Sequence, residues 1–128
     1  MWETTLFLIG AWLTITPPAD MLTDSTSVML LEFNQSMSTA GLFDEENYSI
    51  TDNLGNSIPI YQIQILDTLI DGAGGISIPD TSLIALQIPK GVFKRSYTTV
   101  VNNLTDKTGR EINTNYNRGW YYHIGYLP

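Results

Sequence analysis

Residues 81–101 read TSLIALQIPKGVFKRSYTTVV and predict two β-strands joined by a tight corner. The first half alternates two sets of side chains with the period of a strand, Ile84, Leu86 and Ile88 against Leu83, Ala85 and Gln87. Pro89 has no amide hydrogen to donate to a sheet, and Gly91 tolerates positive φ, so the strand must end there. Tyr97 and Val101 then resume the alternation. This unit is the centre around which we expect the rest of the chain to be arranged.

Further short alternating stretches lie on both sides of this unit, at residues 4–9, 11–16, 27–33, 48–50 and 58–66. Turn residues separate them, and Gly10 permits a bend or bulge between the first two. Another short strand is expected at residues 110–113. About seven strands of this kind predict an all-β fold with two facing sheets. In such sandwiches a tyrosine placed like Tyr97 bonds through its hydroxyl to nearby backbone.

Three aromatic side chains are expected to be structural residues of the core, namely Phe33, Tyr48 and Tyr97. In residues 27–33 the core face is Met29, Leu31 and Phe33, and the other face is Val28, Leu30 and Glu32. Glu32 indicates that this second face meets solvent. Leu42 and Phe43 are expected to anchor the polar loop that follows.

The 128 residues predict a single sandwich at 11–113, an arm or strand at 1–10 and an aromatic strand or arm at 114–128. With no cysteine, disulfides and thiolate metal sites are excluded. The apolar run at residues 6–15 follows no basic segment and is too short to span a bilayer. We therefore expect a strand there, with no signal peptide and no membrane insertion.

A net charge of -7 argues against binding to nucleic acid, whose phosphates are also negative. The charges are unevenly distributed, because residues 1–89 hold eleven acids and no base, whereas 90–128 hold six bases and two acids. If the two halves face different ways, neighbouring copies attract head to tail. If their strands interleave, the asymmetry averages out.

The C-terminal aromatic residues form the candidate interaction surface of the chain: Trp120, Tyr121, Tyr122, His123 and Tyr126. Trp120, Tyr122 and Tyr126 fall on one face of the expected strand, with Tyr121 and His123 on the other. Such rings suit packing onto the N-terminal strand, contact with another chain, or stacking on sugars. All three readings remain open from the sequence.

The spacing of five motifs resembles bacterial Ig-like domains of the surface-layer and cell-surface type, which are related in architecture to fibronectin type III. These motifs are TPPAD at 16–20, LEFNQSMS at 31–38, NYSIT at 47–51, SLIAL at 82–86, and YTTVV at 97–101 leading to LTDKTGR at 104–110. The resemblance covers residues 11–113 and implies a non-catalytic spacer, decoration or adhesion module. It does not cover the two ends, and residues 61–80 look like an insertion.

No residue cluster predicts catalysis or a cofactor. His123 is the only histidine and lies far from any nucleophile motif, so we expect an outward-facing edge residue or a bridge to another chain. Acidic residues gather at 44–46, at Asp20 and Asp24, and at Asp67 and Asp71, but without the spacing of a calcium loop. Solvated loops are the simpler interpretation, and bound calcium is the alternative.

We therefore expect a non-catalytic structural protein that assembles, through its terminal strands, with protein partners or with copies of itself. The first hypothesis is a virion decoration or appendage protein of a phage, since a start at Met1 without a signal peptide fits assembly in the cytoplasm. The alternatives are a module of an exported bacterial cell-surface or adhesion protein, and a module that binds surface glycans through the C-terminal aromatics.

Overall fold

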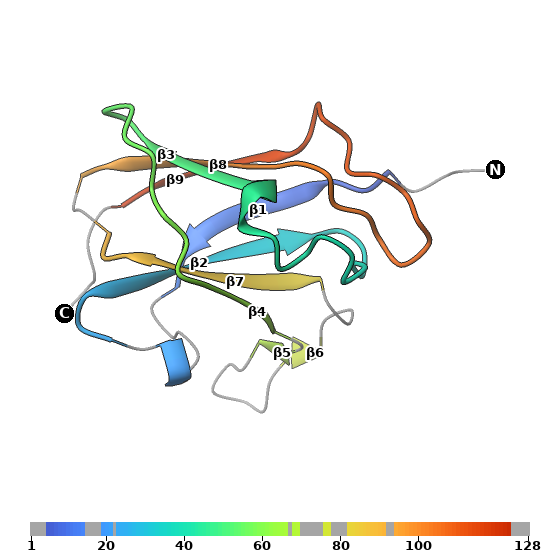
Figure 1. Cartoon of the computed structure of the whole chain (residues 1–128), viewed down its shortest axis with the longest axis horizontal. Coiled ribbons are helices and arrows are strands. Elements are labelled where there is room, and N and C mark those ends of the chain that lie inside the picture. Colours follow the sequence, from blue (N-terminus) through green and yellow to red (C-terminus); the bar gives the residue numbers. More distant parts are fainter. Residues whose placement is uncertain are drawn as a thin grey trace.

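The chain folds as a β-sandwich, which confirms the all-β prediction (Figure 1). The computed structural model describes residues 5–14, 19–21, 23–66, 68–69, 76–77, 82–91 and 94–123. In these ranges, seven strands form two antiparallel sheets, and a short two-stranded ribbon lies beside them. The strands at both ends of the chain, β1 and β9, are among these seven.

The four-stranded sheet has the order β1-β2-β7-β4, and the three-stranded sheet has the order β3-β8-β9. The strands are β1 Leu8–Leu13, β2 Thr26–Phe33, β3 Tyr48–Asp52, β4 Gln62–Leu66, β5 Thr68–Leu69, β6 Ile76–Ser77, β7 Leu83–Pro89, β8 Ser96–Val101 and β9 Arg118–Tyr122. Two 3-10 turns complete the described elements, η1 Ala19–Met21 and η2 Glu45–Asn47. The ribbon pairs β5 with β6.

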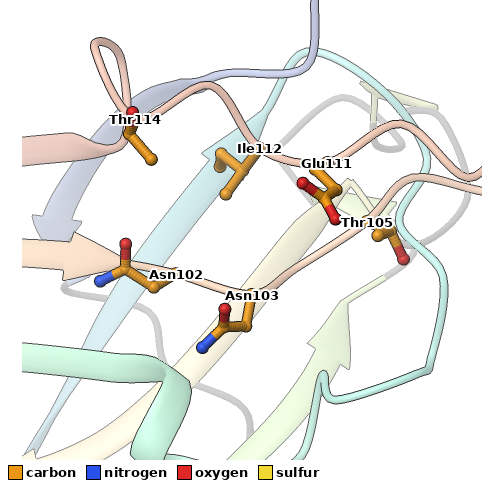
Figure 2. Close-up of a pocket in the computed structure, with 6 residues that line it drawn as sticks. All are labelled: Asn102, Asn103, Thr105, Glu111, Ile112 and Thr114. Atoms are coloured by element: carbon orange, nitrogen blue, oxygen red, sulfur yellow. The ribbon is translucent and has the colours of Figure 1, made fainter.

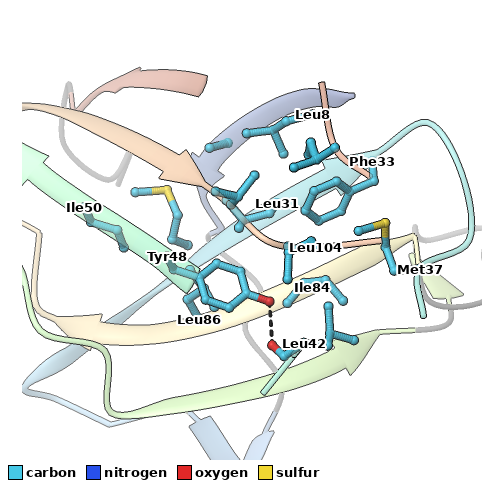
Figure 3. Close-up of a cluster of buried hydrophobic side chains, with 14 of the residues drawn as sticks. Leu8, Leu31, Phe33, Met37, Leu42, Tyr48, Ile50, Ile84, Leu86 and Leu104 are labelled. Atoms are coloured by element: carbon cyan, nitrogen blue, oxygen red, sulfur yellow. Dashed lines mark hydrogen bonds between the residues drawn. The ribbon is translucent and has the colours of Figure 1, made fainter. Parts of the chain in front are cut away.

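The main core lies between the two sheets, where the inward-facing side chains of the alternating strands meet (Figure 3). It contains Leu31, Phe33, Ile84 and Leu86 from the larger sheet and Tyr48, Ile50, Tyr97 and Val101 from the smaller one. Phe33, Tyr48 and Tyr97 are all buried. The predicted alternation of β7 is observed, with Ile84, Leu86 and Ile88 in this core.

The outer face of the larger sheet is not solvent-exposed as we expected, because Val28 and Leu30 are fully buried. They form a second apolar cluster with Met21, Leu83 and Ala85. The 3-10 turn η1 lies over this face of the sheet, and its Met21 covers Val28 and Leu30. We had expected these two side chains to be exposed because they share a strand face with Glu32. Both faces of β2 and β7 therefore contribute to stability.

The loop after β2 is anchored by Leu42, which is buried, while Phe43 projects into solvent. The prediction for Phe43 is therefore wrong. The Tyr48 hydroxyl donates a 2.6 Å hydrogen bond to the Leu42 carbonyl oxygen (Figure 3). Tyr48 thus makes a tyrosine-to-backbone bond of the kind found in such sandwiches, and the bond expected of Tyr97 stays a prediction. Burial raises the pKa of the Tyr48 hydroxyl and keeps it protonated.

Residues 110–113 do not form the predicted strand. Thr105 and Glu111 form an isolated bridge, and two backbone bonds flank it, from the Asp106 amide to the Arg110 carbonyl and from the Ile112 amide to the Leu104 carbonyl. The Asp106 carboxylate accepts hydrogen bonds from the Thr108 and Arg110 amides, and these local bonds favour a tight loop over an extended strand.

The N-terminal strand is continuous through Gly10, with the bulge that this glycine permits. Leu8 pairs with Phe33 and Gly10 with Glu32, so that Ile9 is the extra residue. On its other side β1 runs next to β9 in the same direction. The Leu8 amide donates to the Tyr116 carbonyl, and Ala11 lies against Gly119. The two terminal strands thus close one side of the sandwich.

The basic residues are divided between the two ends of the sandwich. Lys90, Lys94 and Arg95 flank the connection from β7 to β8, whereas Lys107 and Arg110 follow the far end of β8. The four-stranded sheet is built entirely from strands of residues 1–89, whereas the three-stranded sheet combines β3 with β8 and β9 from residues 90–128. The interleaving that would average the charges is therefore absent from the larger sheet, and head-to-tail attraction between copies stays a prediction.

Candidate interaction surface

The outward face of the three-stranded sheet presents two large aromatic side chains of β9. Trp120 is 75% exposed and Tyr122 is 54% exposed, and both point away from the core because strand residues alternate. Trp120 pairs with Thr98 and Tyr122 with Ser96 across β8. We call this surface the aromatic face; its members are Ser49, Thr51, Ser96, Thr98, Val100, Arg118, Trp120 and Tyr122.

Trp120 and Tyr122 lie on the outward face because the residues between and before them, Tyr121 and Gly119, point inward. Gly119 is buried against Ala11, and Tyr121 packs on the main core. Trp120 and Tyr122 must then point outward. The predicted two-sided pattern of the aromatic strand is therefore observed as far as His123, and Tyr126 lies outside the described residues.

His123 is buried, so the expectation of an outward-facing edge residue is wrong. It is only 2% exposed, and its ring lies 6.0 Å from that of Tyr121. Its amide donates to the Arg95 carbonyl, and its carbonyl accepts from the Lys94 amide. The chain thus continues to pair with the start of β8 beyond the last strand residue. Burial lowers the pKa of the imidazole and favours its neutral form.

A second aromatic group lies at the end of the sandwich where β1 begins. Tyr116 is exposed and meets Phe7 edge-on, with ring centroids 6.4 Å apart. These two rings and Thr5 line an apolar hollow of about 300 Å³. The pattern of the sequence did not single out Tyr116, because it lies before the strand, in the turn that precedes β9.

A polar hollow of about 230 Å³ lies among the loops after β8 (Figure 2). It is lined by Asn102, Asn103, Thr105, Glu111, Ile112 and Thr114. Asn103 has positive φ, which its short polar side chain tolerates. Glu111 is the one titratable side chain of this lining, and general acid-base catalysis usually requires a second group. The hollow offers hydrogen-bonding groups without a catalytic pair.

Among the described residues, the buried carboxylates of Asp52 and Asp106 accept hydrogen bonds from backbone amides in turns. Asp52 accepts from the Leu54 and Asn56 amides and lies 3.6 Å from the Arg95 guanidinium. Burial raises the pKa of Asp52, but these hydrogen bonds and the Arg95 charge outweigh that effect and hold it below its usual value. The pKa of Asp106 is lowered in the same way, since hydrogen bonds from Thr108 and Arg110 outweigh burial. Both carboxylates stabilise turns.

The acidic clusters that we considered for calcium have structural partners. Asp44 caps η2 by accepting from the Glu46 amide, and Asp20 accepts from the Gln64 side chain. Asp67 and Asp71 lie outside the described residues. Among the residues that the structure describes, no three His, Asp or Glu side chains come together in a group that would hold a metal ion. Within the same ranges, no helix is long and apolar enough to cross a membrane.

Known proteins match this chain by their structures, whereas searches by sequence find no match. No family model and no curated protein matches the chain. Three solved structures of a bacterial surface-layer protein resemble it. The N-terminal part of the S-layer protein SbsC matches 98% of this chain with a TM-score of 0.63 and 18% identity. Two further SbsC structures, residues 31–844 and domains 1–6, match 98% with a TM-score of 0.66 and 17% identity.

The likeness is one of fold. At identities of 17–18%, it shows a shared sandwich architecture and leaves the Ig-like assignment a prediction. The chain spans only 25% of the first of these structures and 14% of the other two. The proteins are bacterial surface-layer proteins, and they give no support to a role in a virion.

Proposed function

We propose that this chain is a non-catalytic structural module of a bacterial cell surface, joined to other protein domains or copies at its two ends. The resemblance to surface-layer domains supports this reading over the virion hypothesis. The sandwich formed by the strands from β1 to β9 supplies the rigid body, and the chain on either side of these strands supplies the connections.

The observation that carries the proposal is the path of the chain through the sandwich. The Thr5 carbonyl accepts from the Asn34 side chain, just past the end of β2, whereas the His123 amide bonds to Arg95 at the start of β8. Because β2 begins beside Pro89 and ends at Phe33, these two places lie at opposite ends of the sandwich (Figure 1). A module entered at one end and left at the other is suited to a linear array.

The core chemistry fits the same role. Apolar side chains from both sheets fill the space between them, and the two hollows described above lie among the loops after β8 and at the end of the sandwich where β1 begins. Force or attachment at the two ends is then borne by strands that run lengthwise between them. This arrangement suits a spacer better than a binding pocket for a small molecule.

The proposal is tested by locating the protein. An antibody against the folded domain should label the outer surface of intact source cells in immunogold electron microscopy, and permeabilisation should add little labelling. Labelling confined to the cytoplasm would refute the proposal. Labelling of purified phage particles in place of the cell envelope would restore the virion hypothesis.

A further inference from the structure

We propose that the aromatic face binds a neutral, extended polysaccharide. Trp120 and Tyr122 are two residues apart on one side of β9, which separates them by about 7 Å along the strand. Large exposed aromatic rings on a sheet present flat apolar surfaces with polar edges. The flat apolar faces of pyranose rings with equatorial substituents, such as β-1,4-linked glucose and N-acetylglucosamine, match such surfaces.

Hydroxyl groups lie in rows beside the two rings. Thr98 pairs with Trp120 on one side and with Thr51 on the other, so the three side chains form a line across all three strands. Ser96 lies opposite Tyr122. A sugar stacked on a ring would therefore have donors and acceptors within reach for its own hydroxyl groups. A purely apolar partner would leave these groups without hydrogen bonds.

The charge of the face favours a neutral ligand. None of the eight residues of the face is acidic, and Arg118 is its single charged member. The chain as a whole carries a net charge of -7, which repels acidic polymers. A neutral glycan is neither repelled by the net negative charge of the chain nor dependent on charged partners, of which the face offers only Arg118.

The size of the face favours a glycan over a second protein. The face has eight members, whereas a stable protein interface involves about 20–30 residues on each partner. The face alone is too small for a stable dimer, while a short stretch of sugar units would span the roughly 17 Å length of its five-residue strands.

The test is binding of cellohexaose and chitohexaose, measured by calorimetry and by the fluorescence of the tryptophans. We expect binding by the full chain, with a shift of the tryptophan emission to shorter wavelength. Trp120→Ala and Tyr122→Ala should each weaken binding by roughly tenfold, whereas Trp120→Phe should retain part of it because a ring remains. Thr98→Val should also weaken binding, since it keeps the shape and removes the hydroxyl.

Two exposed tyrosines away from the face, Tyr61 and Tyr116, provide matched controls, and their alanine variants should bind as the wild type does. Absence of binding to either sugar at millimolar concentration would overturn the inference. Equal loss in a control variant would also overturn it, as would self-association in sedimentation that Trp120→Ala abolishes. A surface location without sugar binding would refute this inference alone, and sugar binding by a cytoplasmic protein would refute the proposed function alone.

Discussion

Ala11 of β1 and Gly119 of β9 touch at the side of the sandwich where the two sheets meet. A Cβ atom built on Gly119 would lie 2.9 Å from the Ala11 Cβ and 3.0 Å from its backbone nitrogen. Since backbone atoms of a paired strand cannot move aside easily, only glycine allows β9 to approach β1 this closely. The contact joins the first and last described strands of the chain.

Replacing this glycine should weaken the closure. Gly119→Ala is expected to lower the free energy of unfolding by about 1–3 kcal/mol, as overpacked sites do. Urea denaturation followed by circular dichroism measures the change. Gly10→Ala is the matched control, because a Cβ there meets nothing within 4 Å. If the two variants were equally stable, the contact would not constrain the strands.

The hydrogen bond of the Tyr48 hydroxyl should anchor the loop after β2, and removing the hydroxyl should therefore lower the stability. Tyr48→Phe removes the bond to the Leu42 carbonyl and leaves that oxygen buried without this donor, which should cost about 1–2 kcal/mol. Thermal unfolding of the variant measures the loss. Tyr61→Phe, at an exposed ring, should change the stability by less than about 0.5 kcal/mol. An unchanged melting temperature for Tyr48→Phe would refute the anchoring role.

The second apolar cluster should matter as much as an ordinary core. Leu30 is 2% exposed, so Leu30→Ala should reduce the free energy of unfolding by about 2–5 kcal/mol. Ile9→Ala, on the exposed bulge of the neighbouring strand, should cost less than about 1 kcal/mol. A similar small effect for both variants would mean that η1 does not cover the sheet in solution.

His123 should make stability depend on pH near neutrality. Its folded-state pKa is lowered by burial, while the unfolded chain protonates near the usual value of about 6.5. The unfolded state therefore binds more protons below that pH. The free energy of unfolding should be greatest above pH 6.5 and fall as the pH drops through the folded-state pKa. His123→Gln should flatten the curve between pH 5 and 7, and retention of the full slope would point to another group.

Asp52 should contribute in the acid range, with a pKa shift in the same direction as that of His123. Its pKa is lowered in the folded state, so its stabilisation is complete above the usual carboxyl range and disappears as the pH falls through the folded-state pKa. Asp52→Asn should be less stable at pH 7 and should lose less stability between pH 5 and 2. Glu45→Gln, at an exposed carboxylate, serves as the control. Parallel acid-unfolding curves for wild type and Asp52→Asn would contradict this role.

Several features of the site were open to prediction from the chain itself. The alternation of residues 118–123 indicates which aromatic side chains share a face, because strand periodicity is a local property. The burial of Val28 and Leu30 had a signal that we did not use. An unbroken apolar run such as VMLL at 28–31 is typical of a central strand covered on both faces.

Other features had no local signal. Whether His123 points into solvent depends on the residue before β8, Arg95, whose carbonyl accepts from the His123 amide, and on the neighbouring Tyr121 ring. The bond from the Tyr48 hydroxyl to backbone depends on where the loop at Leu42 passes over the core, and no local pattern indicates it. The first contact joins segments that are far apart along the chain, and the second depends on the path of a loop. Neither leaves a repeating pattern in the sequence.

By itself, the sequence determined that this protein is built from short β-strands packed as two sheets, because the alternation of side chains and the turn residues act over a few neighbouring positions. Only the tertiary structure decided which strands lie side by side, that β1 closes against β9, and that Trp120 and Tyr122 remain uncovered. Those outcomes depend on close approach between distant residues, such as Ala11 and Gly119, which no local pattern encodes.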